Sequence, residues 1–229
     1  MIKLIAFDWN GTLLADLRPT VTAENRCFQK LKFNRRLSIK QYQEFYEIPI
    51  RNYWLKLGFD ASYFDKHTKQ VHQAFMDFYE PLEKTCRTRG GAKDVLKWLK
   101  KRRISAIIFS NHMKNHIVRQ TRRLGLWPYL DEILGRPDHD HSHMHVQNKA
   151  LQLKTYLRNK GIKPREVMVV GDTDEEIIIG HKYGYHATAL TGGHQSQKRL
   201  KVARPEFLIH NLKNLKPIIA KLNADSAKN

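Results

Sequence analysis

Polar side chains of the types that bind metal ions and phosphate groups follow three short apolar runs of the sequence. Each run is typical of a buried strand, because its apolar and β-branched residues are bounded by polar residues or glycine. The groups that end these runs are Asp8–Thr12, Ser110–Asn111 and Asp172–Glu176. In a parallel sheet the carboxyl ends of the strands open on one edge, so we expect the three groups to converge in one crevice.

The residue types in this crevice suit phosphate chemistry. Asp8 and Asp172 could hold an octahedral Mg²⁺ whose remaining positions go to water and a phosphate oxygen. Ser110 could donate a hydrogen bond to phosphate, and Lys149, just before a predicted helix, could neutralise a phosphate or an aspartate nucleophile. Alone, the first group also fits a strand that ends in an Asx turn. The order of these features after successive strands favours chemistry.

Strands and helices are expected to alternate through most of the chain. The predicted strands are residues 4–7, 104–109, 129–134, 167–170, 186–190 and 207–209. A helical pattern follows the strands 104–109, 129–134, 167–170 and 207–209. Such alternation builds right-handed βαβ units. It therefore predicts an α/β fold with a parallel sheet covered by helices on both faces.

The segment from Leu13 to about Lys84 has a different pattern. Apolar and aromatic residues recur there at helical spacing, as in Tyr42, Phe45 and Tyr46, and no alternating strand pattern appears. These aromatic stripes indicate helix packing more than a cofactor pocket. We therefore expect an all-helical block inserted between the first strand and the rest of the sheet.

Length and charge limit the class of protein. The 229 residues, 41% of them hydrophobic, are enough for one substantial domain with an insertion. The chain carries 41 basic against 22 acidic residues, and its net charge of +19 favours anionic partners such as phosphorylated metabolites. Because the basic residues are spread along the whole length and no nucleic-acid motif accompanies them, we do not expect specific nucleic-acid binding.

Cysteine use and hydropathy bear on the compartment. Cys27 and Cys86 lie far apart and match no metal or redox spacing, so we expect two reduced thiols of a cytosolic protein. The first apolar run ends at Asp8 and is too short for a signal peptide, and no stretch approaches a membrane span. These features predict a cytoplasmic protein that does not enter the membrane.

The chain resembles the haloacid dehalogenase-like (HAD) hydrolase superfamily, and within it the phosphoglycolate phosphatase-like branch. The resemblance extends to the last strand and rests on four motifs, which are Phe7–Leu13, Ile108–Asn111, Lys149 and Gly171–Glu176. For the third motif, Lys154 is an alternative to Lys149. The resemblance implies a Rossmann-like, doubly wound parallel sheet as catalytic core, formed by residues 1–15 and 86–229, with residues 16–85 as an inserted all-helical cap.

The resemblance also implies hydrolysis of a small phosphomonoester through an aspartyl-phosphate. Asp8 would be the nucleophile. Mg²⁺ would be bound by the Asp8 carboxylate, the backbone carbonyl of Asn10 and the Asp172 carboxylate. Glu176 would contact these ligands without binding the metal itself.

Further residues are implied for the phosphoryl group and the substrate. Ser110, Lys149 and the backbone of Trp9 and Asn111 would bind the transferring phosphoryl group. The cap would close over the site, exclude water and select the substrate. The sequence gives neither the substrate nor the oligomeric state.

Position 10 departs from the family pattern, in which phosphatases usually have Asp. That Asp protonates the leaving oxygen and later activates water, whereas the amide of Asn10 cannot exchange a proton at neutral pH. General acid–base catalysis is typically worth about 10² to 10⁴ in rate. Three explanations stay open: the enzyme is slow, its substrate has a good leaving group such as an acyl phosphate, or a neighbouring acid takes over. His112, Asp174 and the histidine loop are the candidate acids.

The histidine loop is the segment 138–145, with His139, His141, His143 and His145 in alternation. On an extended segment they would share one face and could bind Zn²⁺ or Ni²⁺. No cysteine or ordered ligand spacing accompanies them, which favours an exposed polar loop near the mouth of the site. Binding of the anionic substrate is the alternative. His194, which follows two glycines, is expected in a turn that borders the site.

A second hypothesis comes from another class of function. The chain could be a catalytically silent member of the fold that binds a phosphorylated ligand or an anionic macromolecule. Asn10 and the net charge of +19 are its support. Turnover of p-nitrophenyl phosphate with Mg²⁺, abolished by Asp8→Asn, would separate the two hypotheses.

Overall fold

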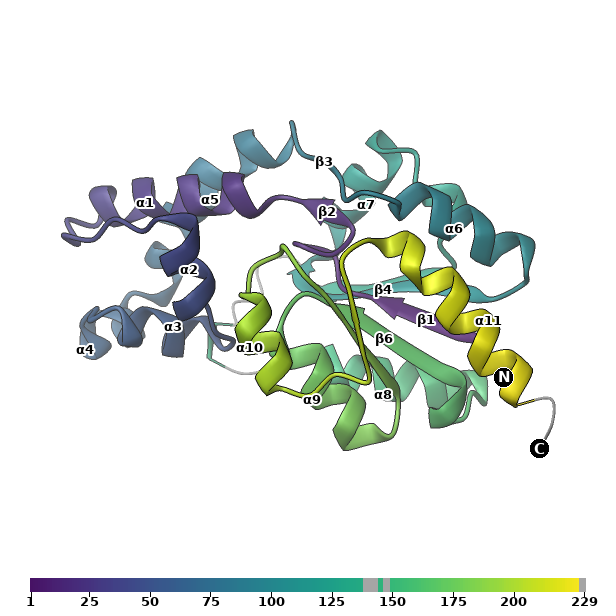
Figure 1. Cartoon of the computed structure of the whole chain (residues 1–229). Coiled ribbons are helices and arrows are strands. Elements are labelled where there is room, and N and C mark those ends of the chain that lie inside the picture. The colour runs from purple at the N-terminus through teal and green to yellow at the C-terminus, as the bar shows by residue number, and fades with distance from the viewer. Residues whose placement is uncertain (138–143, 146–148, 227–229) are drawn as a thin grey trace.

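The sheet at the centre of the protein is six-stranded and parallel, with the order β5-β4-β1-β6-β7-β8. A computed structural model describes residues 1–137, 144–145 and 149–226 (Figure 1). The strands are β1 (Leu4–Phe7), β4 (Ser105–Met113), β5 (Glu132–Arg136), β6 (Val167–Gly171), β7 (His186–Leu190) and β8 (Phe207–Ile209). The strand order reverses at β1, which pairs with both β4 and β6, so a crevice opens beyond the carboxyl ends of these three strands.

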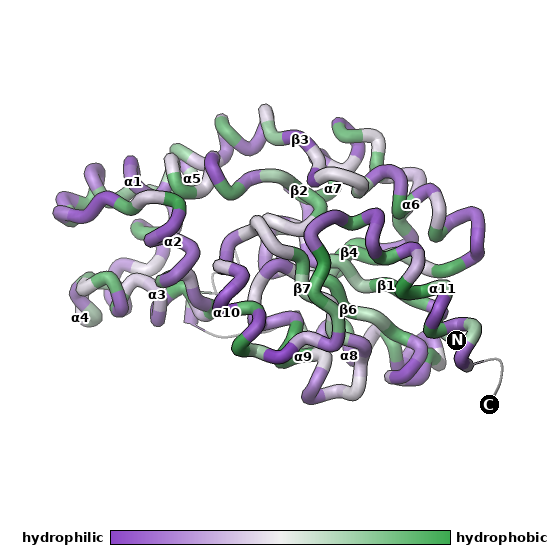
Figure 2. The backbone as a smooth tube through the Cα atoms, viewed as in Figure 1, coloured by the Kyte–Doolittle hydropathy of each residue, from purple (hydrophilic) through white to green (hydrophobic). Residues whose placement is uncertain are grey.

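Helices cover both faces of the sheet (Figure 1). One face carries α6 (Ala92–Lys101), α7 (Lys114–Arg123) and α11 (Leu215–Asp225), and the other carries α8 (Lys149–Lys160), α9 (Asp174–Tyr183) and α10 (Gln197–Val202). Side chains alternate along β1, so Ile5 and Phe7 pack into the first core while Leu4 and Ala6 pack into the second. Figure 2 shows the hydrophobic residues concentrated on these strands. The α/β fold expected from the sequence is confirmed.

The inserted block is a helical cap with its own aromatic core. Its helices are α1 (Leu17–Lys30), α2 (Ile39–Phe45), α3 (Ile50–Lys56), α4 (Ala61–Lys66) and α5 (Thr68–Glu83). Phe28, Trp54 and Phe64 are fully buried among them. Two short antiparallel strands, β2 (Leu14–Ala15) and β3 (Arg87–Thr88), pair where the chain leaves and re-enters the core. The cap therefore has two adjacent connections to the core.

Some local expectations differ from the structure. The β2–β3 pair was not expected, because two-residue strands carry no periodicity. β4 continues to Met113 instead of ending at Phe109, with an irregular register between these residues. β5 begins at Glu132, because the preceding Trp127–Tyr129 forms a 3₁₀ turn around a proline. Two further 3₁₀ turns are Pro164–Glu166 and Leu212–Asn214.

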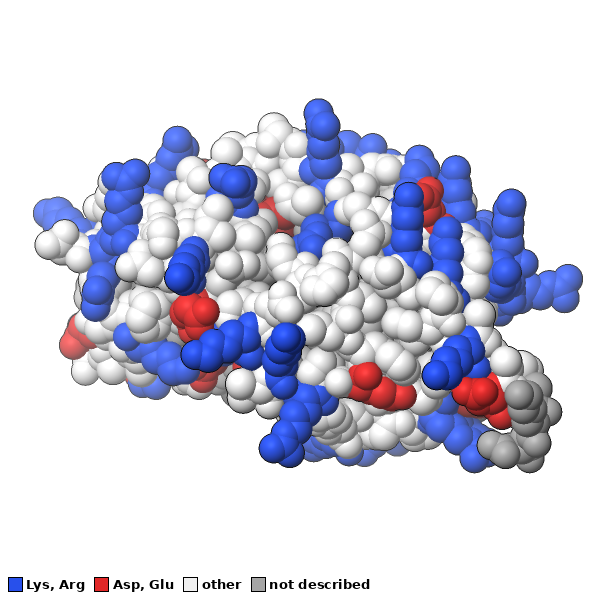
Figure 3. All heavy atoms as spheres, viewed as in Figure 1, with Lys and Arg blue, Asp and Glu red and all other residues white. Residues whose placement is uncertain are grey.

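Surface charge and hydropathy follow the composition. Lysine and arginine are scattered over the face seen in Figure 3 and are not gathered over one element. Within the described residues, none of the helices has the length and apolar character needed to cross a bilayer. Cys27 and Cys86 are both buried free thiols.

Candidate active site

Asp8 and Asp172 stand side by side at the ends of neighbouring strands. Asp8 follows β1 and Asp172 follows β6, and the two residues are 8% and 0% exposed. Two donors fix the Asp172 carboxylate, since Thr12 Oγ1 donates to Oδ1 and the backbone N–H of His194 donates to Oδ2, both at 2.6 Å. The backbone N–H of Trp9 donates to the Asp8 carboxyl group. The strand ends thus bring together the two carboxylates that the sequence analysis paired.

The turn after Asp8 requires glycine at position 11. Gly11 has a φ of +69°, in the left-handed region that favours glycine. A Cβ at this position would lie 2.1 Å from Asp172 Oδ2, so any larger residue would displace that carboxylate. The glycine allows the β1 turn to pass directly over the second carboxylate.

Lys149 is the lysine that reaches the site. It is the first residue of α8, and its side chain is 2% exposed. Its Nζ lies 2.8 Å from Glu175 Oε2 and 3.6 Å from Asp8 Oδ1, and it also hydrogen-bonds Glu176. The alternative, Lys154, instead places its Nζ 5.5 Å from the ring centre of Tyr183. The geometry therefore favours Lys149 for the third motif.

The carboxylates of the site exceed its cations. Burial raises the pKa of Asp8; Lys149 opposes this effect, and Glu176 and Asp172 add to it. Burial likewise raises the pKa of Asp172, and that of Glu175 against the effect of Lys149. Lys149 thus faces three buried carboxyl groups, Asp8, Glu175 and Glu176, and the nearby cation that most lowers the pKa of Asp172 is His194. Closely spaced oxygen ligands short of positive charge fit a hard divalent cation such as Mg²⁺.

Ser110 and Asn111 come from β4 and line the same cavity. Ser110 is buried, and its Oγ accepts a hydrogen bond from the backbone N–H of His112 at 3.3 Å. Asn111 Nδ2 donates to Glu175 Oε2 at 3.0 Å, so this side chain holds a partner of Lys149 in place. Both residues line the cavity, and Glu175 is a further member of the site, to which the sequence analysis gave no role of its own.

Asn10 is tied to a buried cluster that the sequence analysis did not predict. Its Nδ2 donates to Asp16 Oδ2 and to the hydroxyl of Tyr79, both at 2.7 Å. Asp16 also accepts hydrogen bonds from the backbone N–H of Gly11 at 2.7 Å and from Tyr79 at 2.8 Å. His194 Nε2 lies 3.2 Å from Asp16 Oδ1. The amide of Asn10 is therefore oriented by an aspartate from the entry to the cap.

His194 and Asp16 form a buried ion pair. Burial lowers the pKa of His194, but Asp16 and Asp172 outweigh this effect and raise it to about 9. Burial raises the pKa of Asp16, and His194 together with Asn10 and Tyr79 outweighs it, so the pKa is lowered overall. His194 does lie in the expected turn beside the site. The sequence offered no signal for its charge, because its partner is far away along the chain.

The candidate acids that could replace an Asp at position 10 differ in whether they line the cavity. His112 lines it and contacts Glu83, with 3.0 Å between Nε2 and Oε1. Asp174 does not line it, because its carboxylate is held by Gln195 at 2.9 Å and Arg199 at 3.2 Å. In the histidine loop, His139, His141 and His143 lie outside the described residues. His145 Nε2 lies 2.9 Å from Thr68 Oγ1 on the cap.

The cavity lies between the core and the cap. The core contributes Asp8, Asn10, Ser110 and Asn111, and the cap contributes mainly aromatic walls, which include Tyr42, Tyr46, Tyr53, Trp54, Phe75 and Tyr79. Several of these rings also belong to the packed core of the cap. The aromatic stripes therefore serve helix packing, as expected, and line the cavity as well. A phosphate bound by the core would have its organic part against these walls.

Glu24 of α1 is a buried carboxyl group in the cap-side wall, where burial raises its pKa to about 8. In the unfolded chain the Glu24 carboxyl group loses its proton near pH 4.5, whereas in the native state it keeps the proton up to about pH 8. We expect the wild type to lose stability relative to Glu24→Gln as the pH rises from 4.5 to 8, by up to about 1.4 kcal/mol per pH unit.

Urea unfolding of both proteins at pH 5, 6.5 and 8 measures this difference. Glu44→Gln, which removes an exposed carboxyl group of α2, is the matched control. Equal differences between wild type and Glu24→Gln at all three pH values would contradict a buried carboxyl group with a raised pKa.

Comparisons with known proteins relate the sequence and the fold of this chain to those of phosphatases. Residues 5–190 match the family model described as haloacid dehalogenase-like hydrolase. The chain is 23% identical over 223 residues to the phosphoglycolate phosphatase of Vibrio vulnificus, covering 95% of this chain and 96% of that one. It is 21% identical over 223 residues to the pyrophosphatase PpaX of Oceanobacillus iheyensis, and this alignment covers 95% of this chain and 97% of that one. A predicted phosphatase from Clostridium acetobutylicum shares the fold, with a TM-score of 0.80, 16% identity and coverage of 96% and 99%.

Proposed function

The chain belongs to the haloacid dehalogenase-like hydrolase family, and from that premise we propose that it hydrolyses a small phosphomonoester with Mg²⁺ through an aspartyl-phosphate. One observation carries the proposal: Asp8 is a buried carboxylate at the end of the central strand, 3.6 Å from the ammonium of Lys149 and next to Asp172. This arrangement supports Asp8 as the nucleophile, Lys149 as the cation for phosphate, and Asp8 with Asp172 as metal ligands.

In the proposed reaction an oxygen of Asp8 attacks phosphorus, and the bond between phosphorus and the leaving oxygen breaks. Water then attacks the phosphorus of the aspartyl-phosphate, which releases inorganic phosphate and restores the carboxylate. Ser110 and Lys149 bind the transferring phosphoryl group together with the backbone N–H groups of Trp9 and Asn111. The burial that raises the pKa of Asp8 also means that nearby positive charge is needed to keep this nucleophile ionised.

Mg²⁺ would be held by the carboxylates of Asp8 and Asp172 and the backbone carbonyl of Asn10. When bound, it supplies positive charge to the nucleophile and to the phosphoryl oxygens. Glu176 accepts a hydrogen bond from Thr173 Oγ1 at 2.7 Å and holds Lys149, so its role is to position that lysine behind the metal ligands.

The cap is proposed to comprise residues 16–85 and the core residues 1–15 and 86–229. The β2–β3 pair at the boundary supports this division, because both connections run through it. The relatives act, by their names, on phosphoglycolate and on pyrophosphate, so a small phosphorylated metabolite is the proposed substrate class. We also propose a cytoplasmic location, which the two buried free thiols support.

Substitution of Asn10→Asp is expected to raise kcat for alkyl phosphates by about 10²-fold, because it restores an acid for the leaving oxygen. The new carboxyl group would lie where Asn10 Nδ2 now contacts Asp16 Oδ2 at 2.7 Å. Two buried carboxyl groups at this distance share a proton, which keeps one of them protonated. With p-nitrophenyl phosphate the gain should be smaller, since p-nitrophenolate needs no protonation and only the activation of water can benefit.

Steady-state assays of both substrates with the wild type, Asn10→Asp and Asn10→Asp/Asp16→Asn check this expectation. The double variant controls for charge repulsion, and thermal unfolding controls for folding. If alkyl phosphates gain nothing in either variant, the amide does not limit the rate and another acid already acts.

A catalytically silent protein that binds a phosphorylated ligand or an anionic macromolecule is the second candidate. Asn10 favours it, because the amide is held by Asp16 and Tyr79 and has no proton to give. The net charge of +19 also fits an anionic partner. Absence of any Mg²⁺-dependent turnover of p-nitrophenyl phosphate, together with saturable phosphate binding, would decide for this candidate.

A further inference from the structure

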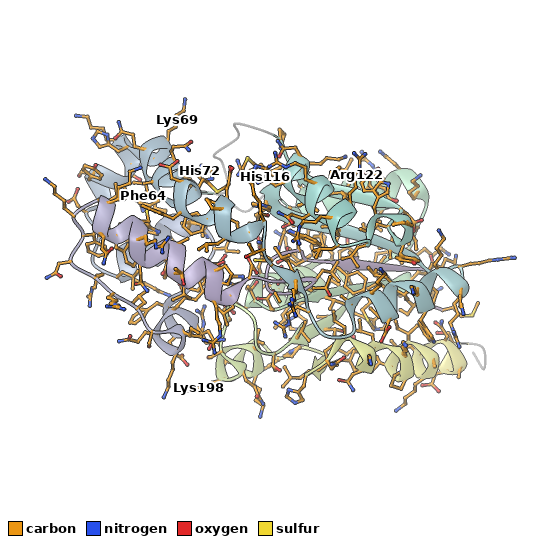
Figure 4. All side chains as sticks on the ribbon, turned by 90° about the horizontal axis from the view of Figure 1, so that it is seen from above. Phe64, Lys69, His72, His116, Arg122 and Lys198 are labelled. Carbon is orange, nitrogen blue, oxygen red and sulfur yellow. The ribbon has the colours of Figure 1, made fainter. Side chains whose placement is uncertain are left out.

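Three potential metal ligands meet where the cap returns to the core, in a group separate from the carboxylates around Asp8. Glu83 is the last residue of α5, His112 lies in β4, and His116 lies in α7. One ligand atom from each side chain lies within 4.8 Å of the other two. Figure 4 labels His116, which lies where the cap helices meet the core. Segments far apart in the sequence thus converge on one point.

The three side chains are closely packed and shielded from solvent. Their side-chain exposures are 2% for Glu83, 11% for His112 and 6% for His116. Glu83 Oε1 lies 3.0 Å from His112 Nε2, and Glu83 Oε2 lies 3.3 Å from His116 Nδ1. Glu80, one turn earlier in α5, reaches His116 Nε2 at 3.6 Å. A single carboxylate therefore bridges two imidazoles inside the protein.

We propose that Glu83, His112 and His116 form a binding site for a divalent transition-metal ion, with Zn²⁺ as the reference ion. Two imidazoles with one carboxylate are a ligand set that suits Zn²⁺ and is not preferred by Mg²⁺. Around a tetrahedral Zn²⁺ with bonds of about 2.0 to 2.2 Å, ligand atoms lie roughly 3.3 to 3.5 Å apart. The observed 3.0 and 3.3 Å are close to this spacing. Water completes the coordination, and Glu80, beside the other ring nitrogen of His116, holds that ring in place.

The position of the site gives the bound ion a structural consequence. Glu83 belongs to the end of the cap just before β3, while both histidines belong to the core. The ion therefore joins the returning connection of the cap to the core. Because His112 also lines the cavity, the same ion fixes one part of the cavity wall. The test of the site does not depend on the proposed phosphatase reaction, because it measures metal binding rather than turnover.

The test is a titration of the metal-free full chain with Zn²⁺ against a chromophoric chelator, in the presence of saturating Mg²⁺. The wild type should bind one Zn²⁺, and His116→Gln and Glu83→Gln should each weaken that binding by at least about 10-fold. Co²⁺ provides a second measurement, because the visible absorption spectrum of bound Co²⁺ should differ between the wild type and these variants. Circular dichroism confirms that each variant is folded.

Three controls locate the ion. His186→Gln removes an exposed histidine that also contacts a glutamate, Glu206 at 2.9 Å, and should leave Zn²⁺ binding unchanged. Asp172→Asn and the replacement of residues 139, 141, 143 and 145 by glutamine should leave it unchanged as well, which excludes the Asp8 site and the histidine loop. The proposal is overturned if the wild type binds no Zn²⁺, or if His116→Gln and Glu83→Gln bind it as tightly as the wild type does.

Discussion

Asp8→Asn is expected to lower kcat for p-nitrophenyl phosphate by at least about 10⁴-fold, the scale seen when a catalytic nucleophile is removed. An amide in this place cannot attack phosphorus, so the aspartyl-phosphate cannot form. It also removes one oxygen ligand of the proposed Mg²⁺ site. The substrate is chosen because its leaving group needs no acid, so the attack by Asp8 does not depend on an acid at position 10. Initial rates with Mg²⁺ at saturating substrate give the result.

Asp174→Asn is the matched control for this prediction. It makes the same chemical change in a carboxylate near the strand ends that is held by Gln195 and Arg199 and does not line the cavity. We expect it to keep most of the activity. Substantial turnover by Asp8→Asn would contradict the covalent mechanism. Equal loss in both variants would point to a general effect of removing negative charge.

Lys149→Met is expected to destabilise the protein by about 3 to 5 kcal/mol, the cost of breaking a buried ion pair by removing one partner. Burial lowers the pKa of Lys149, but Asp8, Glu175 and Glu176 outweigh it and raise the pKa well above its ordinary value. Without the lysine these carboxyl groups lose their counter-charge. The expected fall in Tm is roughly 6 to 20 °C for a chain of this size.

Thermal unfolding of Lys149→Met and Lys154→Met, with and without Mg²⁺, checks this prediction. Lys154 only approaches the ring of Tyr183 from solvent, so its removal should cost about 1 kcal/mol or less. Mg²⁺ should recover part of the stability of Lys149→Met, because it binds the native state and replaces the lost positive charge. Equal Tm values for the two variants would contradict the role of Lys149 as the counter-ion of the site.

The fold and the principal carboxylates followed from local sequence. Apolar runs such as 167–170 predict buried strands because their periodicity and their boundaries are local properties. Polar residues directly after these runs, Asp8 and Asp172, must lie at one edge once the sheet is parallel. The helical cap was predictable for the same reason, since helical spacing is local as well.

Only the tertiary structure decided which side chains meet. Lys149 and Lys154 are equivalent in sequence, but the direction of α8 buries the first against Glu175 and leaves the second near Tyr183. The partners of Asn10 were also hidden, because Tyr79 lies 69 residues away along the chain. The contact of Glu83 with His112 and His116 likewise depends on how α5 returns to the core. Sequence patterns report local periodicity, whereas such contacts depend on the packing of distant elements.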